Sequence, residues 1–104
     1  MITDRDLMEQ ATDHILTRMR REGYYEDAWH LHRLYDDPTV WHINNGWCAQ
    51  WARRVRRLIP RAQVIHDEEH SFVELDGRYY DAEELDGVDD PQDLPFYRDV
   101  PRLV

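Results

Sequence analysis

The chain has 104 residues, a formal net charge of −9 at pH 7 and a single cysteine. This length favours one domain with a modest core, and a lone cysteine excludes an internal disulfide, which is typical of a cytoplasmic protein. No apolar run is long enough to cross a bilayer and the polar start is unlike a signal peptide, so we expect no membrane partner.

Charge is distributed unevenly along the chain. Residues 1–66 contain 10 Arg and 9 acidic residues, whereas residues 67–104 contain 3 Arg and 13 acidic residues. The second part therefore carries a charge of −10 (3 minus 13), which disfavours direct nucleic-acid binding because phosphates would be repelled. A basic protein partner or a cationic substrate suits this part better.

Helical patterns dominate the first half of the chain. Thr3 and Asp6 form a weakened capping box, and the apolar spacing behind them predicts a helix over 4–21. A second helix is predicted over 26–35, followed by a loop over 38–47 and a third helix over 47–59. The third helix has an apolar stripe opposite an arginine cluster over 53–57. We interpret this cluster as a solvated face, with nucleic-acid contact as the alternative.

Strand patterns follow the third helix. Residues 62–67 predict one strand, and "HSFVEL" (70–75) and "RYYDAE" (78–83) flank Asp76-Gly77, which is typical of a two-residue hairpin turn. In this register His70 shares one face of the hairpin with Asp81 and Glu83. Asp81 is its diagonal neighbour and Glu83 its direct neighbour, so either carboxylate could orient the imidazole.

The last segment, residues 84–104, contains three prolines and predicts an irregular acidic tail. We expect Leu94, Phe96 and Tyr97 to pack this tail onto the body. The order of helices followed by strands predicts one α+β domain over 1–104, with three N-terminal helices packed on one side of a small antiparallel sheet.

Cys48 follows the turn formers Asn44, Asn45 and Gly46, so it lies in the first turn of the third helix. The unpaired amides and positive dipole at a helix start lower a thiol pKa and offer donors to an oxyanion. A buried structural cysteine in the apolar stripe is the alternative. A helix-start cysteine, a strand-start histidine and a carboxylate on the next strand are the elements that a Cys-His-Asp nucleophilic site needs.

The stretches "NGWCAQWA" (45–52) and "HSFVELDGRYYDAE" (70–83) resemble the papain-like and transglutaminase-like cysteine hydrolases. The second stretch is also similar to small proteins of phages and other mobile elements. The resemblance implies a minimal form of that fold, with Cys48 as nucleophile, His70 as base and Asp81 as the orienting acid. The glutamine that papain-like enzymes place upstream of the cysteine is absent, and Asn44 and Asn45 stand nearest to its place.

These observations predict thiol-dependent acyl transfer, or hydrolysis of an amide or isopeptide bond, on a peptide or protein substrate. Asn44 or Asn45 would support the oxyanion together with the backbone N–H of Cys48. Trp47 and Trp51 would line a substrate groove, with core packing as the alternative. We expect no cofactor and no metal, because His30 and His32 point apart on a helix and no spacing resembles a zinc site.

A binding protein is the rival prediction. On the same scaffold, a catalytically idle protein of a phage or mobile element could use its acidic surface as an inhibitor. Its target would be a basic, nucleic-acid-binding partner such as a host defence protein.

Overall fold

The computed structural model describes residues 1–22, 43–44 and 46–99. Two longer helices come first, α1 (Asp4–Glu22) and α4 (Cys48–Leu58). Four strands follow: β1 (Gln63–His66), β2 (Ser71–Leu75), β3 (Arg78–Asp81) and β4 (Glu84–Val88). A 3₁₀ helix, η2 (Pro91–Asp93), and a short helix, α5 (Pro95–Asp99), complete the described part of the chain.

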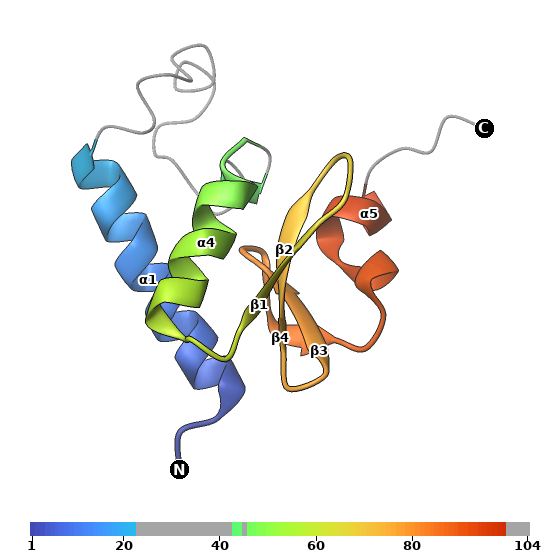
Figure 1. Ribbon diagram of the computed structural model, residues 1–104, viewed down its shortest axis with the longest axis horizontal. Helices are drawn as coiled ribbons and strands as arrows, with labels where there is room; N and C mark the ends of the chain where they lie inside the picture. Colours follow the sequence, from blue (N-terminus) through green and yellow to red (C-terminus); the bar gives the residue numbers. More distant parts are fainter. Residues whose placement is uncertain (23–42, 45, 100–104) are drawn as a thin grey trace.

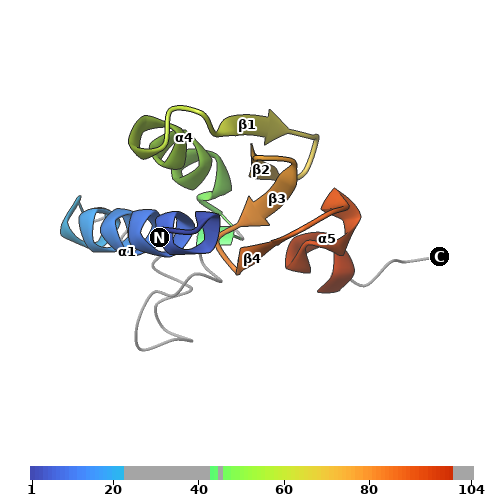
Figure 2. The ribbon, with the colours of Figure 1, turned by 90° about the horizontal axis from the view of Figure 1, so that it is seen from below.

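The strands form one antiparallel sheet in the order β1-β2-β3-β4, with helices on both sides of it. α1 and α4 pack together on one side, and α5 lies on the other (Figures 1 and 2). The α+β class with a small antiparallel sheet is therefore confirmed. Three N-terminal helices on the sheet are not confirmed, because the predicted helix over 26–35 lies outside the described residues.

The start of α1 follows from its capping residues. The Thr3 hydroxyl accepts the Asp6 backbone N–H at 3.1 Å, and the Asp6 carboxylate accepts the Thr3 backbone N–H at 3.0 Å. This reciprocal pair satisfies two donors that a helix start leaves open. A stripe at helical spacing, which includes Met8, Ile15 and Met19, is buried against α4 and the sheet.

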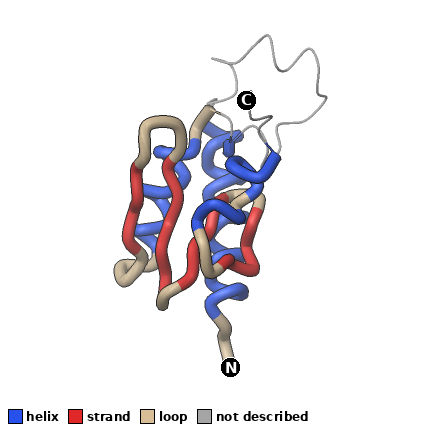
Figure 3. The backbone as a smooth tube through the Cα atoms, turned by 90° about the vertical axis from the view of Figure 1, so that its right-hand side faces the viewer, coloured by secondary structure: helices blue, strands red, loops and turns tan. Residues whose placement is uncertain are grey.

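The hairpin register is the one predicted from Asp76-Gly77. Leu75 pairs with Arg78, and Asp76 and Gly77 have φ angles of 52° and 85°, as the turn requires. Alternate residues face opposite sides. Val73, Leu75 and Tyr80 join the core with α1 and α4, whereas Phe72 and Tyr79 contact each other on the other face. Figure 3 shows the strands from the side that carries α5.

The prediction of a strand through residue 83 and an irregular tail from 84 is wrong. β3 ends at Asp81, which pairs with Glu84, and the two residues between them form the turn into β4. Gly87 explains why a segment rich in acids and glycine can form this strand: a Cβ at Gly87 would lie 2.8 Å from carbon atoms of the Tyr80 ring. A glycine therefore lets β4 approach β3 closely at this position.

Candidate active site

The fold brings together three side chains that the sequence pattern singled out. Cys48 is the first residue of α4, His70 immediately precedes β2, and Asp81 is the last residue of β3. α4 packs on β2, so its first turn meets the beginning of that strand. Trp47, the N-cap residue, provides no side-chain cap, which leaves the first amides of α4 to other acceptors.

The turn between β1 and β2 holds His70 in place. The Asp67 carboxylate accepts the backbone N–H groups of Glu69, at 2.8 Å, and of His70, at 2.7 Å. The Asp67 backbone N–H also donates to the His70 carbonyl at 3.0 Å. Asp67 therefore fixes the backbone from which the imidazole projects.

Asp81 holds one ring nitrogen of His70. Nε2 of His70 lies 3.3 Å from Oδ2 of Asp81, and both side chains are fully buried. The same carboxylate accepts the Asn44 amide at 3.0 Å and the Glu83 backbone N–H at 3.0 Å. These bonds fix the carboxylate, so His70 is directed by Asp81 and not by Glu83.

Cys48 interacts with the same imidazole. Nδ1, the ring nitrogen that Asp81 does not use, is buried and has no hydrogen bond of normal geometry in the part of the chain that is described. The Cys48 thiol nevertheless lies close enough to the imidazole for each group to shift the pKa of the other. The thiol–imidazole contact is thus looser than an ideal hydrogen bond, as is common in nucleophilic sites without substrate.

Burial and hydrogen bonding oppose each other in the pKa values of this pair. Burial raises the pKa of Cys48, but His70 and backbone hydrogen bonds at Ser71 and Ala49 outweigh it and bring the pKa below its ordinary value of 9.0. Burial lowers the pKa of His70, but Asp81 and Cys48 outweigh it and raise the pKa to about 9. The pair therefore favours a thiolate and an imidazolium.

Two aromatic rings from α5 cover the imidazole. Phe96 stacks on His70 with ring centroids 4.2 Å apart and planes inclined by 9°. Tyr97 meets His70 edge-on, at 5.8 Å and 80°. His70 is only 2% exposed as a result, whereas Cys48 is half-buried. Among the described residues, Cys48 is therefore the more accessible member of the pair.

Several predicted supporting residues lie elsewhere or act differently. The Asn44 amide donates to the carboxylates of Asp81 and Glu83, at 3.0 and 2.9 Å, so it is engaged on the acid side and not beside the sulfur. Asn45 lies outside the described residues. Trp51 is fully buried and donates to the Thr12 hydroxyl at 3.2 Å, so its predicted place in a groove is wrong. Trp47 is half-buried and packs against the core.

Sequence reasoning missed two features of this site. The position of Asn44 close to Cys48 in sequence predicts a turn former and an oxyanion donor, and not a partner of Asp81. Phe96 and Tyr97 were expected to pack on the body, but nothing in the spacing of the tail indicated that they would cover His70. Their aromatic character, in a tail otherwise rich in acids, was the only signal.

No protein-family model, curated protein or solved structure matches this chain. Within residues 1–22, 43–44 and 46–99, no group of three or more His, Cys, Asp or Glu side chains is placed to hold a metal ion. None of the helices described is long and apolar enough to cross a membrane.

Proposed function

We propose that this protein catalyses thiol-dependent acyl transfer, either hydrolysis of an amide or isopeptide bond or exchange of the amine. The observation that carries the proposal is the contact of a helix-start thiol with an imidazole whose other nitrogen is held by a buried carboxylate. The substrate class that fits is a peptide or protein carbonyl presented from the side of Cys48.

The first half-reaction uses the thiolate–imidazolium pair. The Cys48 sulfur attacks the carbonyl carbon, and the oxygen that becomes negative is stabilised by backbone N–H groups in the first turn of α4. Nδ1 of His70 donates its proton to the leaving nitrogen as the C–N bond breaks. A free amine leaves, and a thioester remains on Cys48.

The second half-reaction reverses these roles. Neutral His70 takes a proton from water, and the hydroxyl oxygen attacks the thioester carbon. The C–S bond then breaks to give a carboxylic acid and the starting thiolate. If an amine enters in place of water, the product is a new amide. Asp81 keeps the imidazole in one orientation throughout, through Nε2.

The charged surface gives less support to an idle binding protein. Three acidic residues of the C-terminal part, Asp76, Asp86 and Asp89, are engaged in ion pairs with arginines of the same chain. These pairs reduce the acidic surface available to a basic partner. A binding protein without catalytic activity is therefore the alternative, and it is favoured if Cys48 proves unreactive.

Acylation by an activated ester provides that test. With p-nitrophenyl acetate at neutral pH, we expect intact mass spectrometry to detect one acetyl group on Cys48, followed by its loss by hydrolysis. The substitution His70→Ala should slow acylation by about a hundredfold, which is typical of a lost general base. Equal acylation rates for the wild type, His70→Ala and a free thiol would refute the enzyme and favour the idle binder.

A further inference from the structure

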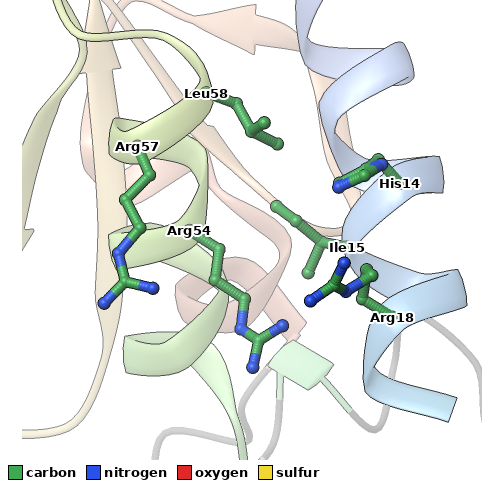
Figure 4. A pocket seen from close by; sticks show the side chains of 6 residues that line it. All are labelled: His14, Ile15, Arg18, Arg54, Arg57 and Leu58. Atoms are coloured by element: carbon green, nitrogen blue, oxygen red, sulfur yellow. The ribbon is translucent and has the colours of Figure 1, made fainter. Parts of the chain in front are cut away.

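A shallow groove lies between α1 and α4, away from Cys48. Its volume is about 190 Å³, and His14, Ile15, Arg18, Arg54, Arg57 and Leu58 line it (Figure 4). A second hollow of about 330 Å³ lies against Arg53, Arg56 and Arg57 on α4. Arg57 belongs to both hollows, so they form one surface, which we term the arginine groove.

The arginine groove is rich in positive charge that the rest of the described chain does not neutralise. Arg53, Arg56 and Arg57 form no ion pair with any described residue, whereas Arg5, Arg61 and Arg78 each pair with a carboxylate. Glu22 is the carboxylate near the groove: it pairs with Arg18 at 3.6 Å and with Arg54 at 2.5 Å. Arg53, Arg56 and Arg57 alone add a charge of +3 to this surface, in a chain of net charge −9.

The groove also has an apolar part. Leu58 is 46% exposed, and the other large hydrophobic residues exposed in the described chain are at its start, Met1 and Ile2. Figure 4 shows Leu58 and Ile15 projecting into the space between the two helices. A partner segment that carries an apolar side chain could cover Leu58 while its charged groups meet the arginines.

We propose that the arginine groove docks an acidic segment of a partner protein. Carboxylates of the segment would pair with Arg53, Arg56 and Arg57, and one apolar side chain would cover Leu58. A nucleic acid fits less well because its phosphates leave Leu58 uncovered, and because the 3 Arg and 13 acidic residues of the C-terminal part repel a long polyanion.

This docking site is separate from the thiol. Leu58 follows Cys48 by ten positions on α4, which places their backbones about 15 Å apart along the helix axis. The proposal therefore does not depend on acyl transfer, and it can be tested in a Cys48→Ala variant of the full chain.

Fluorescence anisotropy with a labelled synthetic peptide of Glu, Asp and Leu tests the proposal. We expect saturable binding, and the double substitution R56A/R57A should raise the dissociation constant by about tenfold or more, since each charge-assisted contact contributes over about 1 kcal/mol. The matched control R61A/R78A also removes two positive charges, from exposed arginines outside the groove. It should change the dissociation constant by no more than about twofold.

Two further probes test which chemistry the groove recognises. A peptide of Glu alone, with no leucine, should bind more weakly, and the substitution Leu58→Ser should remove the difference between the two peptides. The proposal is overturned if neither peptide binds, if R61A/R78A weakens binding as much as R56A/R57A does, or if a single-stranded oligonucleotide binds more tightly than the peptides. The last result would identify a nucleic-acid surface instead.

Discussion

Phe96 lies flat against the imidazole of His70, with ring centroids 4.2 Å apart. This contact joins α5, near the end of the described chain, to Cys48 at the start of α4 and His70 just before β2. The Phe96 ring shields the His70–Asp81 hydrogen bond from water and limits rotation of the imidazole. The face of an aromatic ring also attracts a cation, so it stabilises the charged form of His70. The pair of Cys48 and His70 thus depends on a residue well separated from both of them in sequence.

Phe96→Ala should release the imidazole. Without the stacked ring, we expect His70 to turn away from Asp81, so that the pKa of His70 falls from about 9 toward its ordinary value of 6.5. NMR titration of the imidazole measures this pKa, and the Cys48 alkylation rate at neutral pH should fall in parallel. Phe96→Trp preserves a stacked aromatic ring and serves as the control. A wild-type pKa in Phe96→Ala would show that stacking does not hold the imidazole.

Asp81→Asn should weaken the ion pair without removing a side chain. The substitution removes the negative charge 3.3 Å from Nε2, so the pKa of His70 should fall and that of Cys48 should rise. The alkylation rate of Cys48 at neutral pH should drop by about tenfold, because a smaller fraction of the thiol is ionised.

Glu83→Gln is the matched control for Asp81→Asn. Glu83 accepts the same Asn44 amide, at 2.9 Å, but its side chain does not hold His70. We expect a rate within about twofold of the wild type, because the neutral amide oxygen can still accept that bond. Comparable losses in the two variants would mean that general negative charge, and not Asp81 in particular, supports the imidazole.

The local features of the fold could be predicted because they depend on neighbours in the sequence. The Thr3–Asp6 pair, the Asp76-Gly77 turn and the register of the hairpin each involve residues a few positions apart. Once the register is known, alternation along the strands places Asp81 near His70.

The remaining features depend on contacts between distant segments. Asp86-Gly87 looks like a turn, but Gly87 instead lies in a strand because its missing side chain makes room for Tyr80. The direction of Asn44 is set by carboxylates 37 and 39 residues away, and no pattern near residue 44 contains that information. Tertiary packing overrides local preference at both positions.

Stability should depend on pH through His70. Its pKa is raised in the folded state, so the stabilisation is complete below the unfolded pKa of about 6.5 and is lost as pH rises through the folded value. Cys48 acts in the opposite direction: its pKa is lowered, so its contribution is lost as pH falls. In Cys48→Ser, this opposing contribution is absent and Asp81 alone raises the pKa of His70. Urea unfolding should therefore show a loss of stability that begins near pH 6.5 and is complete below pH 9.

The double variant C48S/D81N provides the control for this pH dependence. Without either partner, the pKa of His70 is no longer raised, and the decline should disappear. A decline of equal size in both variants would assign it to groups other than His70.

Gly87→Ala should be considerably more destabilising than Gly77→Ala. Both glycines have positive φ, 82° and 85°, so alanine carries a similar backbone strain of about 1 kcal/mol at each position. Only at Gly87 does the new methyl group meet the Tyr80 ring, whereas nothing lies within 4 Å at Gly77. Urea denaturation should give a total loss of about 3 kcal/mol for Gly87→Ala. Equal losses would mean that β4 does not pack on Tyr80 as described.

The rate of Cys48 alkylation by iodoacetamide, measured against pH, tests the thiolate–imidazolium pair most directly. The chain has no other cysteine, so the signal comes from Cys48 alone. We expect the thiol to ionise below its ordinary pKa of 9.0, with a further change in rate near pH 9 as His70 loses its proton. We also expect His70→Gln to restore a single ionisation near the ordinary value. One ionisation at or above 9.0 in both the wild type and His70→Gln would contradict the account.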